Sequence, residues 1–156
     1  MKKKLLLCML LCLFCLGGCG KKELLQEKLD ADAIDRVVVL LAMGNPAYGA
    51  DCKVITDGEE IEKLIALFNG AEIGKKIDPA EEYVAGSGSY TFFSGEEQVV
   101  KFNCNGNDPE RIWINDGFYE IDYPDDKVDP YALYSQSKAE AVVVDENGVQ
   151  MERPEA

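Results

Sequence analysis

Histidine is absent from this 156-residue chain. Its absence removes the commonest general base at neutral pH, the Ser-His and Cys-His nucleophile pairs, and most zinc sites. Basic residues are also few, because 16 Lys and Arg stand against 29 Asp and Glu. Binding of nucleic acid and electrostatic docking on an anionic membrane both need clustered cations, so the net charge of -13 argues against both. No Gly-rich phosphate loop opens a helix either.

Long apolar runs are missing as well, since the longest has twelve residues, Leu5 to Leu16. At ~1.5 Å per helical residue this run covers about 18 Å, well short of the ~30 Å hydrocarbon core that a spanning helix must cross. Three lysines precede the run and small residues follow it, which is the layout of an export signal. We therefore expect residues 1–18 to be a signal peptide.

The run ends in Leu16-Gly17-Gly18-Cys19. This motif resembles the lipobox of bacterial lipoproteins, which has an aliphatic residue, two small residues and an obligatory cysteine. In that family the cysteine thiol takes a diacylglyceryl group and a peptidase cuts just before it. An ordinary secretory signal is the alternative, because three further cysteines serve as apolar residues inside the run. Only Cys19 has the small-small prefix at the polar boundary, so we predict that Cys19 is lipidated.

Cleavage before Cys19 would leave 138 residues with 13 basic and 29 acidic side chains, a formal charge of -16. Attachment to the membrane must then come from the lipid, since two acyl chains make a lasting anchor at ~0.8 kcal/mol per buried methylene. We expect a lipid-anchored protein on the extracytoplasmic face of the cell membrane. Apart from a calcium ion at a candidate acidic loop, the covalent lipid on Cys19 is the one non-protein group expected.

The remaining chain divides into a tether, one domain and a C-terminal segment. Residues 19–33 include "GKKELLQEKLD", whose leucines are too sparse for a packed helix, so they are expected to form the lipidated N-terminus and tether. Residues 34–138 suit a single extracytoplasmic domain with a core of its own. Residues 139–156 form either a tail or a small hairpin about Asn147-Gly148.

One amphipathic helix is expected at about residues 58–69. Asp57 caps its first turn, Glu60 completes a capping box, and Gly70 closes the helix as the residue beyond the C-terminal cap. A single apolar stripe at i, i+3, i+4 and i+7 is formed by Ile61, Leu64, Ile65 and Phe68. The pattern predicts a helix that lies on a sheet.

Strands are expected around this helix. Residues 37–41 and 52–56 flank the turn cluster "GNPAYGA" and should pair as a hairpin. In "SYTFFSGEEQVVKFNC" an odd loop of three or five residues around Gly95 would oppose Phe92 to Val100 and Phe93 to Val99. That register gathers the aromatic residues and Cys104 on one face. Residues 71–87 are expected to be irregular.

The segment "RIWINDGFYEID" contains Asp116-Gly117, which predicts a two-residue turn. This turn opposes Ile114 to Tyr119 on the core face and Trp113 to Glu120 on the outer face. Trp113 and Phe118 then form a candidate contact surface for an envelope protein, a peptide or a glycan, because Trp is common at binding hot spots. The alternative is that a loop or a terminal segment covers them.

The overall order predicts an α+β fold, an antiparallel sheet of about six strands with its main helix on one face. Pro130, with Asp129 as a cap, predicts a short C-terminal helix. In the lipobox, and more loosely in "ITDGEEIEKLIALF", "YTF" and "GFYEI", the chain resembles small exported lipoproteins of Gram-positive bacteria that carry an α+β domain. The resemblance implies a cell-surface location and supplies no catalytic residue.

Two further groups of residues are candidate sites. The loop "DYPDDKVD" is a candidate calcium site, because it offers the carboxylates of Asp122, Asp125, Asp126 and Asp129. The loop lacks the spacing and the central glycine of an EF-hand, so a polar turn is the simpler interpretation. Cys52 and Cys104 either form a disulfide, whose loop of about 50 residues would be worth roughly 4 kcal/mol, or stay buried as free thiols.

These observations favour a membrane-anchored binding module with no catalytic residue. The alternative is a carboxylate- or oxygen-metal-dependent enzyme that acts on envelope polymers, since acids are plentiful. Such an enzyme requires two facing acids in a cleft. Neighbouring acids in a chain this acidic are usually a solvated surface.

Overall fold

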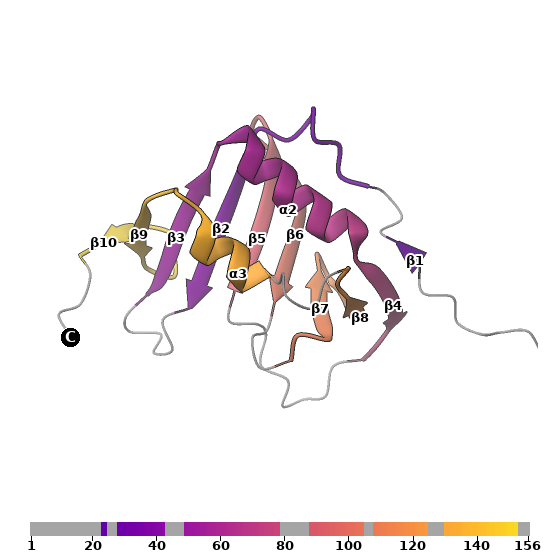
Figure 1. The fold of residues 1–156 in the computed structure, drawn as a ribbon. Helices are drawn as coiled ribbons and strands as arrows, with labels where there is room; N and C mark the ends of the chain where they lie inside the picture. The colour runs from indigo at the N-terminus through magenta and orange to yellow at the C-terminus, as the bar shows by residue number, and fades with distance from the viewer. Residues whose placement is uncertain are drawn as a thin grey trace, which may run out of the picture.

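The computed structural model describes residues 23–24, 28–42, 49–78, 88–104, 108–124 and 130–152. Within these ranges the chain forms one antiparallel sheet of ten strands, in the order β1-β4-β8-β7-β6-β5-β2-β3-β9-β10, and two helices. The strands are β1 (Glu23–Leu24), β2 (Arg36–Ala42), β3 (Ala50–Ile55), β4 (Glu72–Lys76), β5 (Gly88–Ser94), β6 (Glu97–Cys104), β7 (Arg111–Ile114), β8 (Gly117–Asp122), β9 (Ala141–Val144) and β10 (Gln150–Met151). The helices α2 (Gly58–Gly70) and α3 (Pro130–Gln136) lie on the same face of the sheet (Figure 1).

The predicted α+β class is confirmed, but the expectation of about six strands is wrong. The additional strands are short: β4 has five residues, β9 has four, and β1 and β10 have two each. Strands of this length carry too few residues for alternation to be recognised. Two of them are added at the edges of the sheet that the longer strands form, since β4 pairs with β8 and β9 pairs with β3. The C-terminal segment is therefore a hairpin within the sheet.

The core lies between α2 and the sheet. The expected helical stripe is buried, and Phe68 is 0% exposed. The Phe68 ring stacks on Phe102 of β6 with centroids 4.1 Å apart, and it meets Phe92 of β5 edge-on at 5.7 Å. Aromatic pairs of this kind contribute about 0.5–1.5 kcal/mol beyond their buried area. This cluster therefore joins the one long helix to two central strands, β5 and β6.

The first turn of α2 is capped as expected, but its last turn is not. The Asp57 carboxylate accepts a hydrogen bond from the backbone N–H of Glu60 at 3.1 Å. The Glu60 carboxylate, which was expected to complete a capping box, accepts hydrogen bonds from Ser137 and Lys138 after α3. Gly70 is the last helical residue and lies outside the left-handed region, so the predicted glycine cap is wrong. A Cβ on Gly70 would lie 3.1 Å from Cγ of Pro124, so close packing favours glycine there.

The β5–β6 hairpin keeps the predicted facing with a different loop. Phe92 opposes Val100, and Ser94 opposes Glu97, which leaves a two-residue turn instead of the expected three or five. The register shifts between Phe92 and Phe93, so Phe93 opposes Gln98. A bulge absorbs one extra residue in this way, and an even turn becomes compatible with the facing that an odd loop would give.

The β7–β8 hairpin slides by two residues from the predicted register. Ile114 opposes Gly117 and Trp113 opposes Phe118, so the turn is Asn115-Asp116 and not Asp116-Gly117. Asn115 has a φ of 49°, and it holds β6 twice: its N–H donates to the Lys101 carbonyl at 2.9 Å, and its Oδ1 accepts from the Lys101 N–H at 3.0 Å. A slide of two residues leaves every side chain on its predicted face.

The predicted tether, residues 19–33, is wrong in its C-terminal part. Leu29 is 8% exposed and belongs to the core cluster. The side chain of Asn69 holds it in place, because Oδ1 accepts from the Leu29 N–H and Nδ2 donates to the Leu29 carbonyl, both at 2.8 Å. Further towards the N-terminus, β1 pairs with β4, with Glu23 opposite Ile73. The chain thus joins the sheet several residues before the expected domain start.

Candidate functional site

The predicted contact pair lies on the face of the sheet opposite the helices. Trp113 and Phe118 are cross-strand neighbours, and their ring centroids are 5.0 Å apart with the planes tilted by 29°. Phe118 is only 3% exposed, whereas Trp113 is partly exposed. Of the two, Trp113 is therefore the residue that can touch a partner, and Phe118 supports its ring from below. The predicted partner of Trp113 across the strands, Glu120, instead opposes Arg111.

The indole of Trp113 also carries an unused donor. Its Nε1 is buried and has no hydrogen-bond partner among the described residues. A buried donor without a partner costs about 1–3 kcal/mol. Phe in place of Trp would avoid that cost, so the indole N–H serves no structural contact that the described residues show.

The rest of this open face is mixed in character. Neither of the two described helices covers it (Figure 1). Val54 is 47% exposed and Val99 is 45% exposed. The guanidinium of Arg36 lies 4.6 Å from the centroid of the Phe93 ring, a cation–π contact. Scattered aliphatic, aromatic and cationic side chains of this kind can form a contact surface.

Among the described residues Cys52 and Cys104 form no disulfide, and both side chains are buried. Cys52 of β3 and Cys104 of β6 are separated by β2 and β5, which places them three strand spacings or about 14 Å apart. A disulfide requires Cα atoms within about 7 Å. Cys104 lies in the core and Cys52 lies on the other face, so the disulfide interpretation is wrong. Burial raises the pKa of the Cys52 thiol, which disfavours the reactive thiolate.

The proposed calcium loop falls mostly outside the described residues. Asp122 ends β8 and is exposed, while residues 125, 126 and 129 lie outside the described ranges. Over those ranges no three acidic or cysteine side chains converge on a point where a metal ion could sit.

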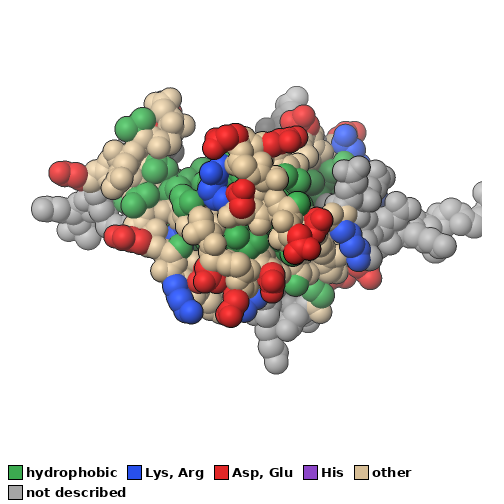
Figure 2. All heavy atoms as spheres, turned by 90° about the horizontal axis from the view of Figure 1, so that it is seen from above, with side chains coloured by type: hydrophobic (Ala, Val, Ile, Leu, Met, Phe, Trp, Pro, Cys, Tyr) green, Lys and Arg blue, Asp and Glu red, His purple; other side chains and the backbone are tan. Residues whose placement is uncertain are grey.

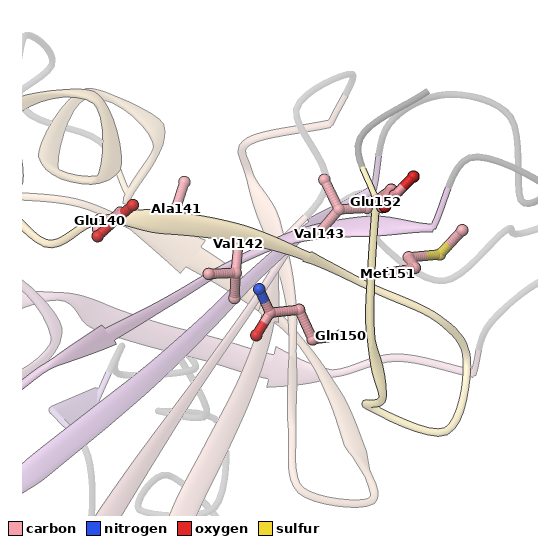
Figure 3. A pocket seen from close by; sticks show the side chains of 7 residues that line it. All are labelled: Glu140, Ala141, Val142, Val143, Gln150, Met151 and Glu152. Atoms are coloured by element: carbon pink, nitrogen blue, oxygen red, sulfur yellow. The ribbon is translucent and has the colours of Figure 1, made fainter. Parts of the chain in front are cut away.

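A hollow of about 580 Å³ lies at the β9–β10 end of the sheet. Its lining comes from both strands of that hairpin and consists of Glu140, Ala141, Val142, Val143, Gln150, Met151 and Glu152. Figure 3 shows the carboxylates of Glu140 and Glu152 at opposite ends of this hollow, pointing away from each other. Two carboxylates so placed do not meet at one substrate bond, as acid–base catalysis requires. Sequence reasoning missed this hollow because it depends on pairing of very short strands.

A polar clamp joins α3 to the helical face. Lys53 is 8% exposed, and its Nζ donates to the carbonyls of Tyr134 at 3.0 Å and Ser137 at 2.9 Å. The Glu60 carboxylate accepts from the Ser137 hydroxyl at 2.6 Å and from the Lys138 N–H at 3.0 Å. The Ser137 hydrogen bond lowers the pKa of Glu60. Partners of this kind explain a buried cation without any ligand, so the clamp is structural.

Acidic side chains are spread over the surface. In Figure 2 red carboxylate side chains are distributed across the visible face, with blue cationic and green apolar side chains between them. Such a distribution is typical of a solvated surface. Neither helix in the described ranges has the length and apolarity that crossing a membrane requires. The lipobox, including Cys19, lies outside the described residues.

Comparison with models of known protein families, with curated protein sequences and with solved structures finds no significant match. The function therefore has to be argued from the residues and from the fold.

Proposed function

We propose that this protein is a lipoprotein, anchored through Cys19 on the extracytoplasmic face of the cell membrane, whose domain is a non-catalytic binding module. The observation that carries the proposal is Leu16-Gly17-Gly18-Cys19 at the polar end of a twelve-residue apolar run. Small residues let the backbone enter a peptidase cleft in an extended form, and the sulfur of Cys19 accepts the lipid. The apolar run is too short to serve as the anchor itself.

The domain supports the binding part of the proposal by its two unequal faces. Two helices cover one face, and the opposite face carries the partly exposed ring of Trp113. A partly exposed Trp supported by a second aromatic ring is a usual centre for recognition. The partner expected is a protein, a peptide or a glycan of the envelope.

Two cysteine variants test the anchor. Cys19→Ala should abolish incorporation of radiolabelled palmitate, and the protein should accumulate as the uncleaved precursor. Cys15→Ala is the matched control, because it removes a cysteine from the same apolar run and should leave labelling and cleavage intact. If Cys19→Ala is cleaved normally at another bond, the protein is an ordinary secreted protein and the proposal fails.

The contact surface is tested by site-specific photo-crosslinking in cells. A photoreactive residue in place of Trp113 should give discrete crosslinked products, whereas the same residue in place of Glu62, on the helical side, should give none. If both positions behave alike, Trp113 does not mark a binding surface. Lipidation would be unaffected by that result.

A further inference from the structure

The N-terminal segment is fixed to the domain at two points. The first is the pairing of β1 with β4 at the edge of the sheet. The second is the double hydrogen bond between Asn69 and the Leu29 backbone, with Leu29 buried in the core. The anchored end of the chain therefore meets the domain at one defined edge.

The length of chain before β1 is short. Four residue steps separate Cys19 from Glu23, and a chain spans at most about 3.6 Å per residue, so the two Cα atoms lie within about 14 Å. If the tether ran to the expected domain start at Ile34, the fifteen steps would reach about 50 Å. Pairing of β1 thus shortens the tether to roughly a quarter of its expected reach.

The sheet is wide compared with this tether. Ten strands about 4.8 Å apart separate β1 from β10 by about 40 Å. Figure 1 shows β1 and β4 at one end of the molecule and β9 and β10 at the other. A lipid attached through Cys19 therefore holds one end of the sheet close to the membrane and leaves the other free to point away.

We propose that the β1–β4 edge of the domain lies against the phospholipid headgroups, with the β9–β10 hairpin at the membrane-distal end. This orientation rests on the proposed lipidation of Cys19. It places the hollow at β9–β10 on the outward end, and it presents the Trp113 face sideways, where partners at the membrane surface can reach it.

The edge carries lysines beside its acids. Lys75 and Lys76 are exposed on β4, and Lys21 and Lys22 immediately precede β1. Lys75 also lies 3.4 Å from Glu120 of the neighbouring strand β8. A lysine near an anionic membrane contributes about 1 kcal/mol, but β1 and β4 also carry Glu23 and Glu72, so their charges balance and the short tether sets the orientation.

Energy transfer on vesicles tests the orientation. The full lipidated protein is reconstituted in phosphatidylglycerol–phosphatidylcholine vesicles that carry an acceptor dye on their headgroups. A donor dye is placed on Lys76→Cys at the β4 edge or on Asn147→Cys at the β9–β10 turn. The parent protein controls for labelling of the buried Cys52 and Cys104. Transfer should be markedly stronger from position 76 than from position 147.

Two matched insertions then test the role of β1. About six Gly and Ser residues between Gly20 and Lys21 add up to about 20 Å of tether before β1 and should remove most of the difference in transfer. The same insertion between Leu25 and Gln26 follows β1 and should leave the difference intact. If both insertions act alike, β1 does not hold the domain.

The outcomes separate this proposal from the one on which it rests. Equal transfer from positions 76 and 147 on vesicle-bound protein means that the domain lies flat or tumbles, which overturns the orientation but not the lipidation. If the wild-type protein purified from cells carries no lipid and does not bind vesicles, the proposed lipidation of Cys19 is overturned. Loss of the difference in vesicles without phosphatidylglycerol, with binding retained, would show that the lysines and not the short tether set the orientation.

Discussion

The two faces of the sheet are built from the same strands, yet they are closed in different ways. On the helical face, Phe68, Phe92 and Phe102 are 0% exposed beneath α2. On the opposite face, Trp113 is partly exposed and Val54 is 47% exposed. Because side chains alternate along a strand, each strand contributes to both faces. The difference indicates that the helical face carries most of the folding energy, and it agrees with the contact role proposed for the open face.

The largest expected effect comes from removing an aromatic ring of the helical face. Phe102→Ala deletes a fully buried ring that stacks on Phe68 at 4.1 Å, and it should lower the free energy of unfolding by about 3–5 kcal/mol. Trp113→Ala, on the open face, should cost about 1–2 kcal/mol because that side chain is only partly buried. Urea denaturation of both variants measures the two values.

Trp113→Phe serves as the control for the open face. It keeps an aromatic ring against Phe118 and removes the indole N–H that has no described partner. Its stability should stay within about 1 kcal/mol of the parent. Should Trp113→Ala destabilise the protein as much as Phe102→Ala does, the open face is a second core and not a contact surface.

A smaller effect is expected at the clamp that holds α3 over the helical face. The Ser137 hydrogen bond is the main cause that lowers the pKa of Glu60 from its ordinary value of 4.5. The folded protein therefore keeps Glu60 charged at a pH where the unfolded chain is already protonated. The resulting stability is present above pH 4.5 and is lost as the pH falls through the lowered pKa.

Glu60→Gln should accordingly be less stable than the parent at neutral pH, and the gap should close as the pH falls below 4.5. Solvent screening keeps this gap under about 1 kcal/mol. Glu62→Gln, an exposed position of the same helix, is the matched control. Denaturation curves between neutral and acid pH measure the gap, and a gap that persists unchanged in acid would mean that the charge of Glu60 does not support the clamp.

The hairpins show what the sequence could predict about this fold. In β7–β8 the apolar residues of both strands lie on the predicted faces, although the pairing slides by two residues. Hydrophobic alternation sets the face, and a slide of two leaves it unchanged. The turn position depends on Asn115 holding Lys101 of β6, and on Gly117, where a Cβ would lie 2.3 Å from the Tyr119 ring. Neither contact is visible in the local pattern.

Contacts between distant segments could not be predicted for the same reason. Lys53 and Glu60 both bind the segment after α3, more than seventy residues away. Asn69 binds the backbone of Leu29, forty residues away in the chain, so the end of the predicted tether belongs to the domain. The candidate site was predicted in part: Trp113 has the expected face, but burial of Phe118 depends on the three-dimensional packing around it.

The smallest effect, and the one that distinguishes the faces most finely, is the reactivity of the two cysteines. Neither thiol forms a disulfide within the described residues, so the mature lipidated protein, unfolded and treated with iodoacetamide without reductant, should gain two alkyl groups by intact mass. Folded protein should gain them slowly, with Cys52 ahead of Cys104.

Cys52 lies on the open face, where local opening of the strand can expose it. Cys104 lies in the core, and its carbonyl accepts from the Tyr131 hydroxyl of α3 at 3.1 Å, so its exposure requires α3 to leave the sheet. Peptide mapping over time in dilute urea gives the two rates. Equal rates that follow global unfolding would show that both faces open together, and the division into a folding face and a contact face would be lost.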